Sequence, residues 1–273
     1  MSRIDWPAII TRAAAIVRTY STGVTLRQLH YRLVSEQLYP NTQSAYKRLS
    51  SLTAEGRRNG TFPDLMDRGR IIHEYTSFAD PEHALDSLLS WYRVDRTEDQ
   101  DVSLYLGVEK AGMVEQLRAW FGHLGLPVLA LGGYASQSYV RDVVDHQRER
   151  GRPAVLLYAG DHDPSGEDID RDFTARTDCW QEVRRVALSA EQVRQYRLPP
   201  NPGKAEDSRA GAFVARHGEL VQVELDALDP ADLRQLFTAA IAEFWDTSAY
   251  ESAIAREAAD RAALARVAEG WSQ

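Results

Sequence analysis

The sequence predicts an α/β protein: a basic, helical N-terminal module, then a parallel β-sheet domain, then a helical C-terminal extension. Three features indicate this arrangement. Residues 6–57 contain three successive helical periodicities. Residues 101–190 alternate short apolar runs with stretches of helix length, which is typical of parallel strands joined by crossover helices. The last sixty residues again follow helical patterns.

Length and composition limit the possible classes of protein. A chain of 273 residues with 44% apolar residues can form one large domain or two ordinary ones. It has no apolar run of membrane-spanning length, and Met1–Trp6 lacks a signal-peptide pattern, so we expect a cytoplasmic protein without a membrane partner. The single cysteine, Cys179, excludes an internal disulfide, and the seven histidines show no paired ligand spacing, so no structural zinc is expected.

Charge is distributed unevenly along the chain. Residues 1–72 carry 11 Lys and Arg against 5 Asp and Glu, whereas the whole chain has a net charge of -8. A basic module joined to an acidic one is typical of a nucleic-acid-binding domain attached to a metal-carboxylate domain. The alternative is two surfaces that are merely solvated by different charges.

The N-terminal module is predicted to contain three helices. The first begins at Trp6, the second spans Leu26–Leu38 after the capping residue Thr25, and the third spans Thr42–Arg57. Asn59-Gly60 is a turn signal, and 62–72 could form a short ribbon or wing. Three helices and a wing describe a winged helix-turn-helix, whereas a purely structural three-helix bundle is the alternative.

In the winged-helix interpretation, the third helix reads a DNA groove while basic side chains contact the phosphates. The candidate DNA-binding residues are Lys47, Arg48, Arg57 and Arg58. A further helix starts at Asp80-Pro81, and the charged run 93–101 is the best linker in the chain. We therefore predict a winged-helix domain over 1–95 and a sheet domain with C-terminal helices over 101–273.

The predicted sheet domain alternates strands and helices. The expected strands are Ser103–Val108, Pro127–Leu131, Pro153–Ala159 and Val183–Leu188. The expected helices between them are Ala111–His123, Ser136–Arg150 and Glu167–Arg176. Further on, Val221–Leu225 has the pattern of a strand, and helices are expected from Asp229 to Phe244 and from Tyr250 to Trp271.

Acidic residues follow two of these strands. Glu109 comes directly after the first, and Asp161 and Asp163 come after the third. Since residues two apart in an extended backbone point the same way, the three carboxylates can converge at one sheet edge. They would suit Mg²⁺, with Mn²⁺ as a substitute. Alternatively, Asp163 forms an Asx-type turn with the backbone around Pro164 and Gly166.

Three motifs at this edge are more specific together than singly. They are Glu109-Lys110, the loop Gly132-Gly133-Tyr134 before a helix that carries Arg141, and Asp161-x-Asp163-Pro164-x-Gly166-x-x-Ile169. This set resembles the Toprim domain of the topoisomerase VI A-subunit family, which includes the meiotic double-strand-break transesterase. Family members place a winged-helix domain before Toprim, with the nucleophilic tyrosine in an Arg-x-x-Tyr-Tyr segment.

The matching segment here runs from Arg27 to Tyr31, with His30 in place of the first tyrosine. The resemblance therefore implies that Tyr31 is the nucleophile. Arg27 and His30 are candidates for removing or sharing its proton, and Lys110 and Arg141 could add positive charge at the phosphate. On the second helix, Tyr31 lies off the centre of the apolar stripe, which predicts that it is exposed; the alternative is an aromatic residue at a helix contact.

The implied activity is magnesium-dependent cleavage of double-stranded DNA by tyrosine transesterification, with rejoining, in a homodimer associated with the nucleoid. This chain contains no ATPase segment, so strand passage would need a separate ATPase subunit. A magnesium nuclease that uses water with the same acids is the second hypothesis, and a non-catalytic DNA-binding module is the third. A haloacid-dehalogenase-like phosphatase is disfavoured because its Asp-x-Asp belongs after the first strand, not the third.

Overall fold

The computed structural model describes residues 4–20, 23–66, 75–201 and 209–271. Within them, one sheet of four parallel strands has the order β2-β1-β3-β4. The strands are β1 (Ser103–Val108), β2 (Val128–Ala130), β3 (Ala154–Ala159) and β4 (Trp180–Ala187). This confirms the predicted α/β class and all four strands of the sheet domain, with β2 shorter and β4 longer than the sequence pattern indicated.

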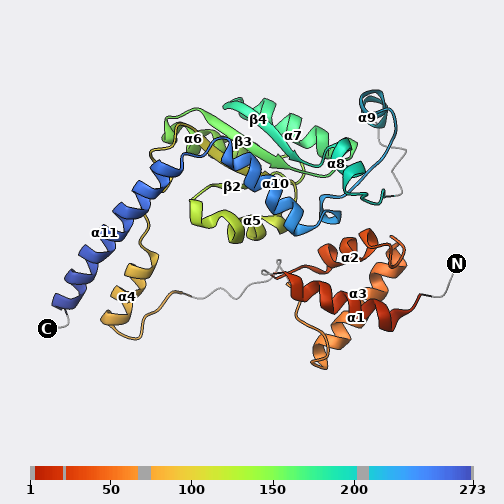
Figure 1. The fold of residues 1–273 in the computed structure, drawn as a ribbon, viewed down its shortest axis with the longest axis horizontal. Helices are drawn as coiled ribbons and strands as arrows, with labels where there is room; N and C mark the ends of the chain where they lie inside the picture. The colour runs from red at the N-terminus through yellow and green to blue at the C-terminus, as the bar shows by residue number, and fades with distance from the viewer. Residues whose placement is uncertain (1–3, 21–22, 67–74, 202–208, 272–273) are drawn as a thin grey trace.

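Helices cover both faces of the sheet (Figure 1). One face holds α6 (Gln137–Arg150) and α7 (Pro164–Thr177), and the other holds α5 (Val114–Phe121) and α10 (Pro230–Ala242). Short 3-10 turns flank α5 at η1 (Ala111–Met113) and η2 (Gly122–Leu124). Successive side chains of β1 point to opposite faces of the sheet, so Leu104 and Leu106 enter the core on one face and Tyr105 enters the core on the other.

Three N-terminal helices form a separate apolar cluster with Leu29, Leu33 and Leu49 completely buried. They are α1 (Trp6–Thr19), α2 (Leu26–Ser35) and α3 (Gln43–Arg58). As predicted, Thr25 caps α2, and its side chain accepts a hydrogen bond from the Gln28 amide. The helix ends three residues earlier than expected, because Gln37 adopts a left-handed conformation.

The predicted wing falls largely outside the described residues, since 67–74 are not among them. The part that is described, 62–66, contains no strand. It packs back on the helices through Phe62, which is buried, and through the Met66 amide, which donates to the Val24 carbonyl at 2.9 Å.

The C-terminal third is mostly helical. It contains α8 (Ala190–Gln195), α9 (Ala210–His217), η3 (Leu225–Ala227), α10 and α11 (Thr247–Trp271). The predicted strand 221–225 is wrong: the segment forms only single bridges, from Val223 to His162 and from Gln222 to Asn201. Alternating valines suggested a strand, but the segment pairs with loops and not with the sheet.

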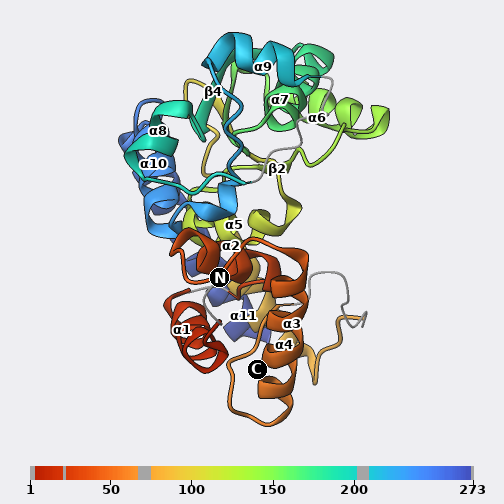
Figure 2. The same cartoon turned by 90° about the vertical axis from the view of Figure 1, so that its right-hand side faces the viewer.

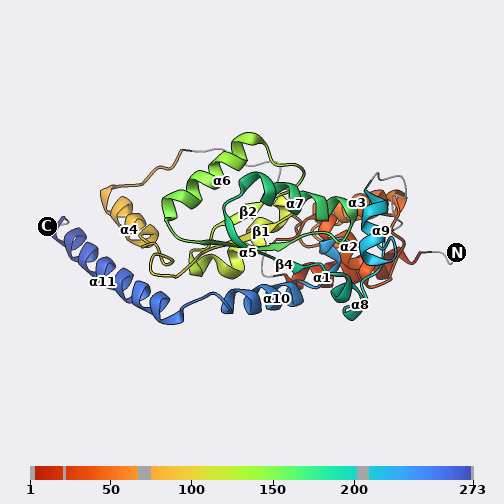
Figure 3. The same ribbon diagram turned by 90° about the horizontal axis from the view of Figure 1, so that it is seen from above.

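The helix α4 (Pro81–Trp91) packs against α11, at the end of the molecule opposite α1–α3 (Figures 1 and 3). The segment after α4 is attached to the same helix, because Arg96 forms a salt bridge of 2.7 Å with the buried Glu257. No helix in the described part of the chain is long and apolar enough to span a bilayer.

Candidate functional site at the carboxyl edge of the sheet

The ends of β1 and β3 bring Glu109 and Asp161 together. The two strands are neighbours, with Val108 opposite Ala159 in the register. Beyond the last pair, the amide of Asp161 donates to Glu109 Oε2 at 2.8 Å. The two strand ends therefore lie at one edge as the sequence predicted, and the contact between them joins the Glu109 carboxylate to the backbone of Asp161, not to its carboxylate.

Gly166 allows the first turn of α7 to lie against Asp161 and Glu109, because glycine has no side chain. A Cβ at this position would lie 2.4 Å from the carbonyl oxygen of Asp161 and 3.1 Å from Glu109 Oε2. The Gly166 amide donates to Asp163 Oδ1 at 2.6 Å, so Asp163 caps α7. This is the backbone contact expected in the alternative interpretation of Asp163, and it fixes that carboxylate at the same edge.

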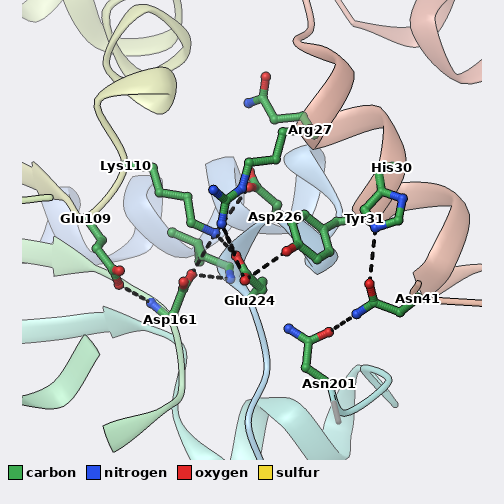
Figure 4. Close-up of polar contacts among 12 residues, drawn as sticks. Arg27, His30, Tyr31, Asn41, Glu109, Lys110, Asp161, Asn201, Glu224 and Asp226 are labelled. Atoms are coloured by element: carbon green, nitrogen blue, oxygen red, sulfur yellow. Dashed lines mark hydrogen bonds and ion pairs between the residues drawn. The ribbon is translucent and has the colours of Figure 1, made fainter. Parts of the chain in front are cut away.

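Lys110 projects into the middle of the acids (Figure 4). Its Nζ lies 3.0 Å from Asp161 Oδ1 and 3.1 Å from Asp226 Oδ2, and it also contacts Glu224. Burial alone would lower the pKa of Lys110, but the three carboxylates outweigh it and the net shift is upward. The lysine therefore stays charged and neutralises part of the site.

Two of these acids, Glu224 and Asp226, belong to a segment that sequence reasoning did not assign to the site. The segment is held in place because the Leu225 amide donates to Asp161 Oδ1 at 2.7 Å. Its backbone also pairs with His162 through Val223. Two signals could have identified it: the spacing Glu-x-Asp repeats that of Asp161 and Asp163, and residues 224–228 resemble an acidic segment that topoisomerase VI A-subunit family members carry after Toprim.

The site carries more negative charge than its cations neutralise. Within the described residues, Glu109 and Asp163 form no salt bridge, although Asp161, Glu224 and Asp226 share Lys110. Burial, followed by neighbouring carboxylates, raises the pKa of Glu109, and burial raises that of Asp161 despite Lys110. Hard oxygen donors with unbalanced charge suit a hard divalent cation such as Mg²⁺. In the described part of the chain, however, Glu109, Asp161 and Asp163 are not a group whose ligand atoms all lie within 4.8 Å of one another, so their carboxylates would have to move closer to share one ion.

Tyr31 reaches this cluster from α2. Its hydroxyl donates to Glu224 Oε1 at 3.0 Å, and its ring lies 5.6 Å from both Arg27 Cζ and Lys110 Nζ (Figure 4). The expectation that Tyr31 is exposed is wrong, because the ring is half-buried against the 221–228 segment. Burial, together with the nearby Glu224 carboxylate, raises the pKa of Tyr31 to about 12.

The two residues expected to help Tyr31 take different positions. Arg27 Nη2 lies 3.2 Å from Glu224 Oε2, so it shares the acceptor of the Tyr31 proton. His30 is buried in the helical cluster, where Nε2 contacts Asn41 Oδ1 at 3.1 Å and Nδ1 contacts the Tyr39 hydroxyl. Both ring nitrogens of His30 are therefore engaged away from the Tyr31 hydroxyl.

The other predicted site residues do not contact the acids in the described part of the chain. Arg141 is exposed on α6 and forms no ion pair with the acids in the part of the chain that is described. On α3, Lys47, Arg48 and Arg58 are exposed, whereas Arg57 is half-buried and donates to the Thr53 carbonyl at 3.3 Å. The exposed α3 cations are available to an anionic partner.

A cavity of about 420 Å³ lies between α2 and the sheet edge. Its lining includes Arg27, Tyr31, Asp163 and Glu224, so the tyrosine faces the same space as two of the acids, whereas Glu109 and Asp161 do not line it. Beside it, Arg32 pairs with Asp229 at 2.7 Å and ties α2 to the start of α10. Figure 2 shows α2 as the N-terminal helix nearest to the sheet domain.

No protein-family model matches this chain, and no curated protein is detectably similar to it in sequence.

Proposed function

We propose that this chain cleaves double-stranded DNA in a magnesium-dependent reaction, with a winged-helix domain and a Toprim domain arranged as in the topoisomerase VI A-subunit family. One observation carries the proposal. Tyr31 donates a hydrogen bond of 3.0 Å to Glu224, and Glu224 shares Lys110 with Asp161, one of the predicted metal ligands.

DNA binding is assigned to the basic N-terminal module. Lys47, Arg48 and Arg58 project from α3, and Arg57 lies on its last turn. Contacts of this kind between cations and phosphates provide affinity and orient a duplex without reading its sequence. A duplex held on α3 would present a phosphate to the cavity that contains Tyr31.

In the covalent reaction, the Tyr31 oxygen attacks the phosphorus atom and the 3′-oxygen of the neighbouring nucleotide leaves, which creates a 5′-phosphotyrosyl bond. Glu224 is the group placed to accept the Tyr31 proton, since the hydroxyl already donates to it. Lys110 and Arg27 flank the ring and stabilise negative charge on the oxygen. Reversal of the same steps rejoins the strand.

Glu109, Asp161 and Asp163 are the residues that would hold Mg²⁺, which supplies positive charge at the reacting phosphate when bound. Lys110 keeps the acidic edge together by pairing with Asp161. Arg185 supports the edge from behind, because its guanidinium donates to the Asp161 carbonyl at 2.6 Å.

The resemblance also implies a homodimer in which the tyrosine of one protomer serves the metal site of the other. In this structure, Tyr31 contacts Glu224 of its own chain. In the proposal, this is the resting arrangement, and the contact opens when DNA is bound. A separate ATPase subunit would be needed only for strand passage.

A hydrolytic nuclease is the second candidate, and the environment of Tyr31 favours it. Tyr31 is half-buried, its hydroxyl is hydrogen-bonded to a carboxylate, and its pKa is raised to about 12. Such a phenol is a poor nucleophile near pH 7. In that case water attacks the phosphate, the same acids hold the metal, and Tyr31 only attaches α2 to the sheet domain.

Replacing Tyr31 by Phe distinguishes the two reactions. The change keeps the ring but removes the attacking oxygen, so the covalent route predicts that cleavage falls by about 100-fold or more. The assay uses supercoiled plasmid with Mg²⁺, and the gels are compared with and without protease digestion. DNA that enters the gel only after digestion of the wild-type reaction indicates a covalent link.

Tyr46→Phe is the matched control, because Tyr46 lines the neighbouring cavity with Tyr31 but does not contact the acids. It should cleave like the wild-type protein. Near wild-type cleavage by Tyr31→Phe, with ends free of protein, would exclude the covalent route and support the nuclease.

A further inference from the structure

A second cluster of ligand-type side chains lies behind the acidic edge. It consists of His162, which sits between Asp161 and Asp163, together with Glu167 in the first turn of α7 and His217 at the end of α9. One ligand atom from each residue lies within 4.8 Å of the other two. Sequence spacing did not reveal this group, because the two histidines are 55 residues apart.

The geometry of the 161–163 segment explains why the histidine faces away from the acids. His162 forms an antiparallel bridge with Val223, with its amide donating at 2.8 Å and its carbonyl accepting at 2.9 Å. In an extended segment, successive side chains point to opposite sides. Asp161 therefore faces Lys110, and His162 faces Phe213 and His217.

The buried imidazole of His162 has a nitrogen atom, Nδ1, without a hydrogen-bonding partner in the part of the chain that the structure describes. Its side chain belongs to a residue that is 2% exposed, and among the described residues Nδ1 has no hydrogen bond. An unpaired buried nitrogen costs about 1–3 kcal/mol, so a buried imidazole is normally paired. A metal ion would provide the missing partner.

The cluster opens onto a cavity of about 470 Å³ that both histidines line. Glu167 is engaged from the other side, where Oε1 contacts His217 Nε2 at 2.6 Å and Oε2 contacts Arg216 at 2.6 Å. The two imidazoles thus reach the wall of the cavity, from which water or an anion can complete a coordination shell, and Glu167 approaches them from the opposite side.

We propose that His162, Glu167 and His217 form a binding site for a first-row transition metal ion of the Zn²⁺ class, separate from the magnesium site. Two imidazoles and one carboxylate are a ligand set that zinc accepts, with a fourth position left for solvent. Imidazole ligands suit Zn²⁺, whereas Mg²⁺ takes oxygen ligands. The 161–163 segment then has acids for a hard cation on one side and an imidazole for a softer one on the other.

Binding requires a small rearrangement. Ligand atoms around tetrahedral zinc are about 3.3 Å apart when the bonds are about 2.0 Å. The His217–Glu167 contact of 2.6 Å must therefore widen, and His162 must approach both. The ion would join the 161–163 segment, α7 and α9, so we expect binding to raise the thermal stability of the chain.

Zn²⁺ binding by chelator-treated protein tests the site, with calorimetry and metal analysis performed in excess Mg²⁺. We expect about one Zn²⁺ per wild-type chain and a rise in Tm. His217→Gln keeps a polar group beside Glu167 but removes the imidazole that would bind the ion. Losing a residue that only hydrogen-bonds to a metal ligand already costs about 10–100-fold in metal affinity, so losing a ligand should lower the affinity for Zn²⁺ by about 100-fold or more. Glu167→Gln is a second variant, in case the first is unfolded.

Two matched controls locate the ion. His146→Gln removes a histidine that instead bonds to the Tyr105 hydroxyl, and Glu109→Gln removes an acid of the magnesium site. Both should bind Zn²⁺ like the wild-type chain. No Zn²⁺ on the wild-type protein, unchanged binding by His217→Gln, or equal loss in either control would overturn the proposal.

Discussion

The contact between α2 and the 221–229 segment differs in kind from the interior of the sheet domain. The contact consists of polar groups: Tyr31 and Arg27 bind Glu224, and Arg32 pairs with Asp229. The interior consists of apolar side chains, among which Leu157 and Phe237 are 0% exposed.

The two kinds of contact contribute different amounts to the free energy of folding. A partly exposed ion pair contributes about 0–1 kcal/mol, whereas burying one large apolar side chain contributes about 1.5–3 kcal/mol. Each module is therefore stabilised mainly by its own core. The polar contact can open at low cost, which is what the proposed entry of DNA between Tyr31 and the acids requires.

The largest expected effect is on chemistry at the acidic edge. Asp161→Asn and Glu109→Gln keep the side-chain shapes but remove charge from the proposed metal ligands, so cleavage should fall by about 100-fold or more. Binding to a labelled duplex should persist, because it depends on the basic module. Undiminished plasmid cleavage by both variants would exclude the proposed magnesium site.

The next effect concerns the apolar interior. Phe237→Ala removes a fully buried ring and should lower the free energy of unfolding by about 3–5 kcal/mol, measured by urea denaturation. Hydrogen exchange should show lost protection in β3 and β4 but retained protection in α1–α3. Equal loss in both modules would mean that they unfold as one unit.

His30 should make the N-terminal module sensitive to acid. Burial lowers the pKa of His30 below the unfolded value of about 6.5, so the unfolded chain binds the proton more readily. This contribution to stability is complete above about pH 6.5 and is lost as the pH falls below it. His30→Gln should reduce the slope of unfolding free energy against pH in that range; an unchanged slope would contradict this assignment.

The smallest effect is expected at the polar contact. Arg32→Ala removes the pair with Asp229 and should lower stability by about 1 kcal/mol or less. A double-mutant cycle with Asp229→Ala should give a coupling energy of that size that shrinks in high salt. A coupling of several kcal/mol would show that the two modules are joined more rigidly than their polar contact indicates.

Local patterns in the sequence determined most of the architecture. Apolar periodicity predicted the three N-terminal helices and the four strands, since side chains must alternate or spiral to reach a core. The meeting of Glu109 and Asp161 was also predictable, because parallel strands place their carboxyl ends at one edge. Tyr31 and Lys110 were identified by motif and not by periodicity.

Only the tertiary structure decided which irregular segments complete the two proposed sites. Glu224 and Asp226 reach Lys110 from more than 100 residues away, and His217 reaches His162 across 55. These residues lie in short loops or at a helix end, where no repeating pattern marks the buried side. Their positions follow from single backbone bridges, such as that between His162 and Val223, which form only once the sheet and its surrounding segments have folded.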